Sequence, residues 1–281
     1  MSSNPELSKP NSSDDETQSS DIVEQLRLAK YFLTRNSLNV TDRSYVITAD
    51  DLAKVIWLFP IVGIAIGGLG AIALILFIWT GIPEPVAAAL SVGLIIWITK
   101  ATQEDGLANL IDGFGSGKNQ EQKIAIMKSK NRGSYGILCL AIVTIAKVAA
   151  IASIAYIDSG AAAAAIIAAA VWSRSLIAPS MRWLPPLIEA LPSEWIITPS
   201  EGNTCKGLIL GFLLLALMLI TPAGTSFIII LIAGGASAFA IGCLALWQIK
   251  GYTVDILWSI QQVAETTVLV VTSAIIIGNI A

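Results

Sequence analysis

Carboxylate and amide side chains gather between residues 104 and 112, directly after an uncharged run that is apolar enough for a membrane. In a helix, Asp105, Asn109 and Asp112 would share one face at positions i, i+4 and i+7, with Glu104 beside them. Such oxygen ligands suit a hard cation, and Mg²⁺ needs few of them because it keeps waters and shares phosphate oxygens. The spacing therefore predicts a magnesium- and phosphate-binding face at a membrane surface.

Lysine and arginine side chains follow the acidic residues within the segment 100–133. Lys128 and Arg132 are candidates for binding the phosphate groups of a substrate. In a simpler interpretation the cations set membrane topology, Asp105 caps the start of a helix and Gly113 ends it. Topology is the favoured interpretation for the cations alone, whereas function is favoured for the acidic face.

Isolated polar residues also interrupt or border the apolar runs. Arg174 either faces a cavity or partner, where it could bind phosphate, or extends to the lipid headgroups. Asp255, Gln262 and Glu265 follow a roughly helical repeat and could share a face, with interfacial solvation as the alternative. Lys147 could pair with a carboxylate or face a cavity.

The composition is that of an integral protein of the lipid bilayer. Of the 281 residues, 55% are hydrophobic and only 13% are charged, against about 25% charged in a soluble domain. The net charge of −3 gives no basic excess for binding nucleic acid. The absence of histidine excludes histidine-based zinc sites, histidine general bases and Ser-His-Asp triads.

The uncharged runs predict an all-α, polytopic fold with about seven transmembrane helices, six to eight being compatible with the sequence. We expect a disordered tail over residues 1–20, an amphipathic cytoplasmic segment over 21–52, and a single membrane domain over 21–281. The expected spans are 55–83, 85–99, 135–157, 159–174, two within 207–249 that separate at 221–225, and 266–281.

The distribution of lysine and arginine predicts the orientation. Seven spans place almost every such residue on one side, which the positive-inside rule assigns to the cytoplasm of a bacterial inner membrane. The N-terminus and the 100–133 loop then face the cytoplasm. All the candidate polar residues except Lys147 converge there, which predicts one cytoplasmic active site.

Short motifs in one order along residues 22–281 resemble those of a known family. They are Phe32-Leu-Thr-Arg35, Phe59-Pro-Ile-Val-Gly63, Glu104-Asp-Gly-Leu-Ala with Asp112-Gly, Ile126-Met127 with Gly133-Ser-Tyr-Gly136, Ser173-Arg174, and Gly251-Tyr-Thr-Val-Asp255 with Glu265. The chain resembles the cobalamin synthase family of adenosylcobinamide-GDP ribazoletransferases.

The resemblance implies a Mg²⁺-dependent phosphotransfer in late cobalamin biosynthesis. Such enzymes join adenosylcobinamide-GDP, a corrinoid nucleotide, to α-ribazole or its 5′-phosphate, and GMP leaves. By this analogy Asp105 and Asp112, with Asn109 and Glu104, would hold the metal. The analogy also suggests these further roles: phosphate binding by Arg174, substrate binding by Lys128, Arg132 and Thr253, and a base or additional ligand role for Asp255 or Glu265. A homo-oligomer or a complex with other cobalamin-assembly enzymes is a further expectation.

The chain differs from the family pattern at several motif positions. Gln103 replaces a usual histidine, Asn109 a usual aspartate, and Val254 a usual glycine; Ser129 and Asn131 stand where an aspartate and an arginine are usual. The alternative function is therefore an impaired paralogue that acts as a corrinoid-binding or scaffold subunit. A transporter is less favoured, because its site would lie near the membrane midplane.

Overall fold

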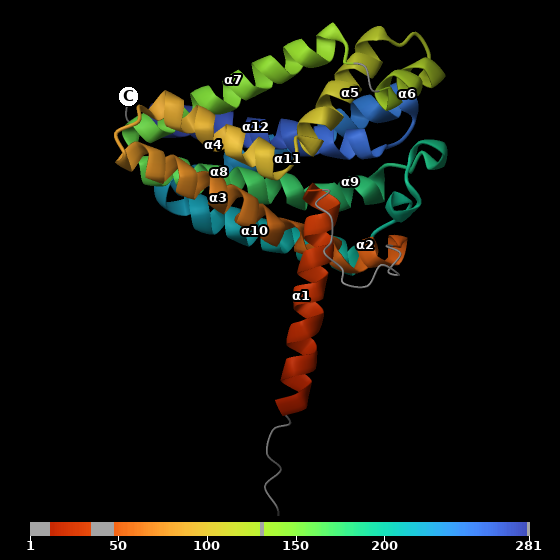
Figure 1. Cartoon of the computed structure of the whole chain (residues 1–281), viewed down its shortest axis with the longest axis horizontal. Helices are drawn as coiled ribbons and strands as arrows, with labels where there is room; N and C mark the ends of the chain where they lie inside the picture. The colour runs from red at the N-terminus through yellow and green to blue at the C-terminus, as the bar shows by residue number, and fades with distance from the viewer. Residues whose placement is uncertain (1–11, 35–47, 130–131, 280–281) are drawn as a thin grey trace, which may run out of the picture.

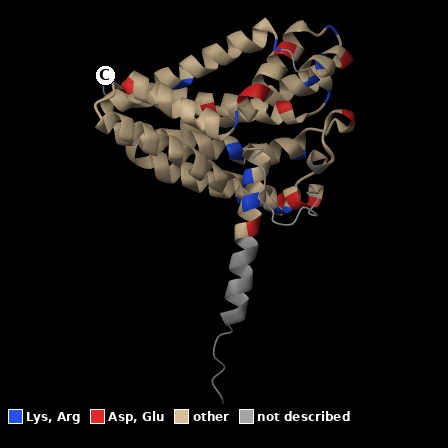
Figure 2. Ribbon diagram, viewed as in Figure 1, with Lys and Arg blue, Asp and Glu red and all other residues tan. Residues whose placement is uncertain are grey.

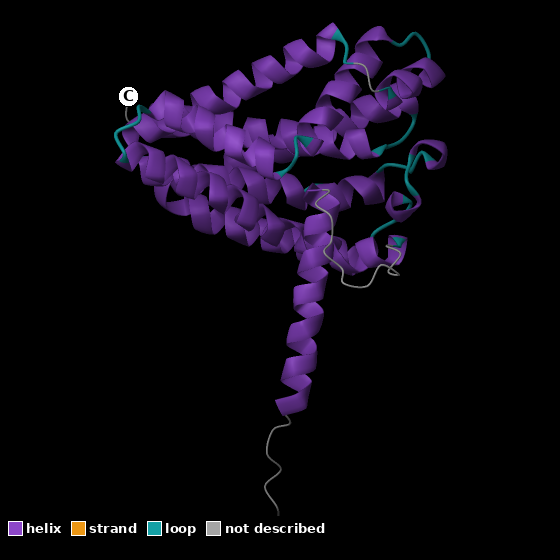
Figure 3. Ribbon diagram, in the orientation of Figure 1, coloured by secondary structure: helices purple, strands orange, loops and turns teal. Residues whose placement is uncertain are grey.

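The protein is all-helical, as the apolar runs predict. The computed structural model describes residues 12–34, 48–129 and 132–279, and no strand occurs within these ranges (Figure 3). The long helices that form the bundle are α3 (Phe59–Trp79), α4 (Glu84–Ile98), α7 (Ser134–Ile157), α8 (Ser159–Ser175), α10 (Glu201–Ala223), α11 (Phe227–Ile249) and α12 (Val254–Gly278) (Figure 1). The others are α1 (Ser12–Thr34), α2 (Ala49–Val55), α5 (Thr102–Ser116), α6 (Gln120–Lys128), α9 (Ile177–Trp183), and the short 3₁₀ helices η1 (Ile56–Leu58), η2 (Ile188–Ala190), η3 (Ser193–Trp195) and η4 (Gly224–Ser226).

Five segments of the described chain are long and apolar enough to cross a membrane, or six if the bent pair α4–α5 is counted as one span. The expected number of about seven is therefore not confirmed by this criterion. One of the five segments, Glu201–Ile249, contains both α10 and α11. These helices separate at η4, within the predicted break at 221–225.

Contacts with Trp172 indicate that α10 and α11 run in opposite directions. A Cβ atom added to Gly234 of α11 would lie 2.8 Å from Trp172 Cδ1, and one added to Gly211 of α10 would lie 3.6 Å from Cε3 of the same ring. Both helices therefore reach the level of Trp172, which requires the chain to turn back between them. Gly224, with φ of 56°, lies at that turn.

The centre of the bundle is α8, whose alanine run is buried against its neighbours. Its small side chains allow close backbone approach, since a Cβ atom at Gly63 of α3 would lie 2.7 Å from the carbonyl oxygen of Ala170. Gly67, one turn later, lies equally close to α8. The alanine run and the Gly63–Gly67 pair therefore serve the packing of α3 against α8.

A sharp elbow joins α4 to α5. The two helices differ in direction by 89°, and Lys100 and Ala101 between them have φ values of 55° and 54°. The left-handed conformation costs an ordinary residue about 1–2 kcal/mol, so tertiary packing rather than local preference holds this bend. The elbow directs α5 across one end of the bundle (Figure 1).

Charged residues gather at the end of the bundle where α2, α5, α6 and the segment after α9 lie (Figure 2). The connections at the opposite end are residues 80–83, 158 and 224–226, which contain Asp158 but no lysine or arginine. This asymmetry matches the prediction from the sequence that lysine and arginine lie on one side of the spans.

Two boundaries differ from those expected. The last helix begins at Val254, ahead of the span expected from residue 266, so the helical repeat expected for Asp255, Gln262 and Glu265 is confirmed, whereas interfacial solvation of the buried Glu265 is not. The tail expected to be disordered over 1–20 overlaps α1 from Ser12 onward. Residues 1–11, and residues 35–47 of the expected amphipathic segment, lie outside the described ranges.

Candidate functional site

Three polar contacts join α5 to α12. Asn109 Nδ2 donates to Asp255 Oδ1 at 3.0 Å, Ser259 Oγ donates to the Gly106 carbonyl at 3.2 Å, and Gln262 Nε2 donates to Glu104 Oε1 at 2.8 Å. The residue numbers of the partners increase along α12 as they decrease along α5, so the two helices are antiparallel. We call these three contacts the α5–α12 ladder.

The middle of the ladder is a close approach of two backbones. A Cβ atom at Gly106 would lie only 2.5 Å from Cβ of Trp258, which is itself buried and lies edge-on to Trp195 with ring centroids 5.4 Å apart. Glycine at position 106 is therefore required by packing. This contact gives a physical reason for the glycine in the Glu104-Asp-Gly motif.

Gly106→Ala is expected to destabilise the protein by about 1–3 kcal/mol, because the added methyl group overlaps Trp258 and separates the two helices. Thermal unfolding in detergent measures the effect. Gly68→Ala is the matched control, since a Cβ atom there meets nothing within 4 Å and alanine favours a helix. Equal stability of the two variants would contradict this packing role.

The outer end of the ladder carries a cluster of charged and amide groups. Arg132 forms an ion pair with Asp105 at 2.7 Å, with 34% and 54% of the two side chains exposed, and it also donates to Asn109 Oδ1. Asn109 in turn contacts the partly exposed Asp255. We call Asp105, Asn109, Arg132 and Asp255 the outer cluster. The structure thus brings together four predicted site residues from three separate segments.

Asp112 lies apart from the outer cluster and is buried. Its carboxylate accepts hydrogen bonds from the backbone N–H groups of Gly133 at 2.7 Å and Gly136 at 2.8 Å, at the start of α7. A Cβ atom at either glycine would collide with this carboxylate. Asp112 therefore stabilises the N-terminus of α7. The helix α5 itself continues past Gly113 to Ser116, so the expected termination at Gly113 is wrong.

A second, buried cluster surrounds Glu265 in the interior of the bundle. Its carboxylate pairs with Lys147 at 2.7 Å and Arg174 at 3.1 Å, and accepts a hydrogen bond from Gln261 at 2.6 Å. Arg174 also donates to Gln103 at 3.2 Å. We call these residues the inner cluster. Arg174 is 1% exposed, so the alternative that it extends to the lipid headgroups is wrong.

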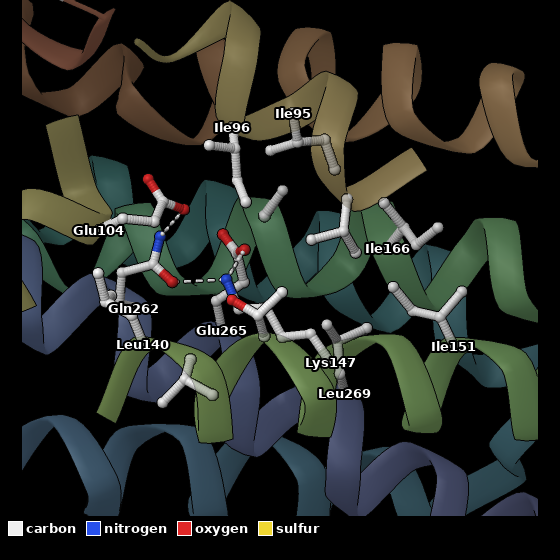
Figure 4. A pocket seen from close by; sticks show the side chains of 14 residues that line it. Ile95, Ile96, Glu104, Leu140, Lys147, Ile151, Ile166, Gln262, Glu265 and Leu269 are labelled. Atoms are coloured by element: carbon white, nitrogen blue, oxygen red, sulfur yellow. Dashed lines mark hydrogen bonds and ion pairs between the residues drawn. The ribbon is translucent and has the colours of Figure 1, made fainter. Parts of the chain in front are cut away.

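Lys147 satisfies both expectations for it, since it pairs with a carboxylate and faces a cavity. The cavity has a volume of about 20 Å³, room for about one water molecule. Figure 4 shows Glu104, Gln262, Glu265 and Lys147 pointing toward one another among aliphatic side chains. Among the described residues, Glu104 Oε2 is a buried oxygen without a hydrogen-bond partner.

An open groove of about 620 Å³ lies between α6 and residues 186–190. Lys128 crosses it, donating from Nζ to the Glu189 carbonyl at 2.8 Å. The 186–190 wall is tied to Tyr252 by the hydrogen bond from Leu187 N to the Tyr252 carbonyl at 3.1 Å. This volume is in the range of small-molecule sites.

Tyr252 and Thr253 anchor the start of α12. The Tyr252 hydroxyl donates toward the carbonyl oxygens of Trp195 and Ile197 at 3.0 and 3.1 Å, and burial raises the pKa of this phenol to about 12. Thr253, a predicted substrate-binding residue, is buried and its Oγ1 accepts from Ile256 N. Its hydroxyl therefore caps α12.

The predicted metal ligands lie in three places along α5. Asp105 and Asn109 are in the outer cluster, Asp112 caps α7, and Glu104 faces the inner cluster. Across the part of the chain that the structure describes, no three acidic, histidine or cysteine side chains form a ready-made metal site. The outer cluster offers two carboxylates, Asp105 and Asp255, which fits a metal that takes its other ligands from water and substrate.

Pattern alone did not reveal the roles of three polar residues. Gln103 joins Arg174 to the Leu33 carbonyl, Gln261 joins Glu265 to Ser173, and Ser259 forms the middle contact of the ladder. The signal that could have indicated these roles was the occurrence of serine and glutamine in helices packed inside the bundle. Of the other positions that differ from the family pattern, Ser129 follows α6, and Asn131 lies outside the described ranges.

The fold and these clusters define a multi-pass α-helical membrane protein with a carboxylate- and guanidinium-lined site at one end of its bundle. The family model for cobalamin-5-phosphate synthase matches residues 25–273, and the chain belongs to that family.

Named relatives match over nearly their whole length. An adenosylcobinamide-GDP ribazoletransferase of Mesorhizobium japonicum is 31% identical over 252 residues, which cover 90% of this chain and 93% of that protein. Proteins of the same name from Allorhizobium ampelinum and Bradyrhizobium diazoefficiens are 32% and 29% identical, and the matches cover 95% and 96% of their lengths. No solved structure matches the chain.

Proposed function

We propose that the protein is an adenosylcobinamide-GDP ribazoletransferase, which carries out a late step of cobalamin biosynthesis. The observation that carries this proposal is the outer cluster, where Asp105, Asn109, Arg132 and Asp255 converge on one partly exposed face. Family membership and the relatives' names supply the reaction.

In the proposed reaction a ribose hydroxyl of α-ribazole, or of its 5′-phosphate, attacks the phosphate nearest the cobinamide. A new phosphoester bond forms, the bond to the oxygen of the leaving GMP breaks, and the hydroxyl proton passes to a base. Asp255 is the best-placed base, because its carboxylate is partly exposed and lies beside Asn109 in the outer cluster. Glu265 suits that role less, since it is buried between two cations.

Arg132 would bind the diphosphate by exchanging its present partners, Asp105 and Asn109, for phosphate oxygens. Mg²⁺, when bound by Asp105 and the substrate phosphates, would neutralise charge that builds up as GMP leaves, and Asp255 would stay available as the base. Lys128 and the groove beside α6 would receive part of a nucleotide substrate. Catalysis then consists mainly of positioning and charge neutralisation.

The proposed location is a bacterial inner membrane, with the outer cluster facing the cytoplasm. Support comes from the charged end of the bundle and from connections without lysine or arginine at the opposite end. Association into a homo-oligomer, or with other cobalamin-assembly enzymes, stays a prediction.

Purified protein in detergent is expected to release GMP from adenosylcobinamide-GDP when α-ribazole or its 5′-phosphate is supplied with Mg²⁺, and to stop when the metal is chelated. Chromatography of nucleotides and corrinoids measures both products. Corrinoid binding without turnover by well-folded protein would contradict the proposal and support the impaired paralogue. Corrinoid uptake into sealed vesicles would instead support a transporter.

A further inference from the structure

Lys147 is a buried cation that the proposed reaction does not use. It lies on α7, is 5% exposed, and is surrounded by the aliphatic lining of the small cavity. A lysine inside a membrane bundle is costly unless its ammonium group is fully paired. A methionine of similar length would suit this lining, so stability does not by itself explain a lysine here.

The ammonium group of Lys147 holds the deepest contact of the α5–α12 ladder. Its Nζ donates to Gln262 Oε1 at 2.5 Å and to Glu265 Oε1 at 2.7 Å, and Gln262 then donates to Glu104 at 2.8 Å. A continuous chain of hydrogen bonds therefore joins α7, α12 and α5. Lys147 also fixes the amide of Gln262, since it occupies the oxygen and leaves the nitrogen for Glu104.

Glu104 and Gln262 lie on the same two helices as the reacting face. Asp105 follows Glu104 directly, and Asn109 and Asp255 form the outer contact of the same ladder. Between the two ends, Gly106 and Trp258 are in tight backbone contact. Because helices are stiff, a displacement of α5 against α12 at the inner contact changes the separation of Asn109 and Asp255 as well.

We propose that Lys147 is a positioning residue for the outer cluster, acting through Gln262 and Glu104 on the spacing of α5 and α12. Arg174, the other cation facing Glu265, contacts α12 through Glu265 and α5 through Gln103, so its contacts are separate from the chain that runs through Gln262 and Glu104. The inference deepens the proposed function and depends on it for its kinetic readout.

The test compares variants at the two ends of this chain of hydrogen bonds. Lys147→Met and Gln262→Leu are each expected to lower kcat for GMP release about tenfold to a hundredfold, as a small misplacement of reacting groups does, with KM changed less than about twofold. Gln262→Leu keeps the charge of the inner cluster unaltered, so it tests the chain of hydrogen bonds even if Lys147→Met does not fold.

Lys147→Arg is expected to restore most of kcat, because arginine can donate to both partners and the adjacent cavity gives it room. Thr144→Val, in the same cavity lining, is the matched control and keeps the parental kcat.

Hydrogen exchange of the α5 backbone provides a readout that needs no turnover. Lys147→Met or Gln262→Leu is expected to speed exchange in α5 while α10 keeps the parental rate. The proposal would be overturned if folded Gln262→Leu kept both the parental kcat and the parental exchange rate of α5. It would also be overturned if Lys147→Met lowered kcat and Lys147→Arg lowered it just as much. Absence of GMP release by the parent protein would overturn the proposed function, and α5 exchange would still decide the role of Lys147.

Discussion

Replacing Glu265 with glutamine is expected to destabilise the folded protein by about 3–5 kcal/mol, because it leaves the two buried cations of the inner cluster without their shared counter-charge. Lys147 and Arg174 are 5% and 1% exposed, so water cannot solvate their positive charges in place of the lost carboxylate. Thermal unfolding in detergent should show the melting temperature lowered by roughly 10 °C.

Glu201→Gln is the matched control for this result. Glu201 also pairs with an arginine, Arg182, but 78% of its side chain and 40% of the arginine's are exposed. Exposed pairs contribute about 0–1 kcal/mol, so this variant should melt close to the parent. If Glu265→Gln also melted close to the parent, the inner cluster would not stabilise the bundle through its charges.

Asp255→Asn is expected to reduce kcat for GMP release about 10²- to 10⁴-fold, the range for loss of a general base. Asparagine has nearly the same shape and its oxygen can still accept from Asn109, so the ladder should persist and the melting temperature should change little. Single-turnover GMP release measures the chemical step directly.

Asp158→Asn is the matched control, because it removes a carboxylate far from the outer cluster and shows whether such a loss alone lowers kcat. Asp158 is exposed at the opposite end of the bundle and caps α8 through Gly160 N at 2.7 Å. Asparagine caps helices about as well as aspartate, so this variant should keep the parental kcat. A fully active Asp255→Asn would show that another group accepts the proton.

Most of the bundle could be predicted from the sequence because membrane spans have a strong local signal. Uncharged runs of about 20 residues are nearly sufficient to place a spanning helix, and α7 and α8 lie close to the ranges expected. The helical repeat of Asp255, Gln262 and Glu265 was expected, but these polar residues placed the start of the last span near residue 266 rather than at Val254. Burying that stretch requires partners from α5, α7 and α8, which no local pattern shows.

The candidate site was predictable as a set of residues but not as an arrangement. Helical spacing correctly placed Asp105 and Asn109 on one face, yet the same spacing included Asp112, whose carboxylate instead caps the start of α7. Which neighbour each carboxylate meets is decided by contacts distant in the sequence, such as Asn109 with Asp255. Metal binding by any of these residues stays a prediction.

The elbow between α4 and α5 also decides which partners the acidic residues of α5 can reach. Because α4 starts at the end of the bundle that lacks lysine and arginine and finishes at the charged end, a straight continuation into α5 would carry Glu104, Asp105 and Asp112 out past that end and away from α12. Turning by 89° at Lys100 and Ala101 keeps them at the end of the bundle. The left-handed conformation at the elbow is therefore the local cost of bringing Glu104 and Asn109 into contact with Gln262 and Asp255.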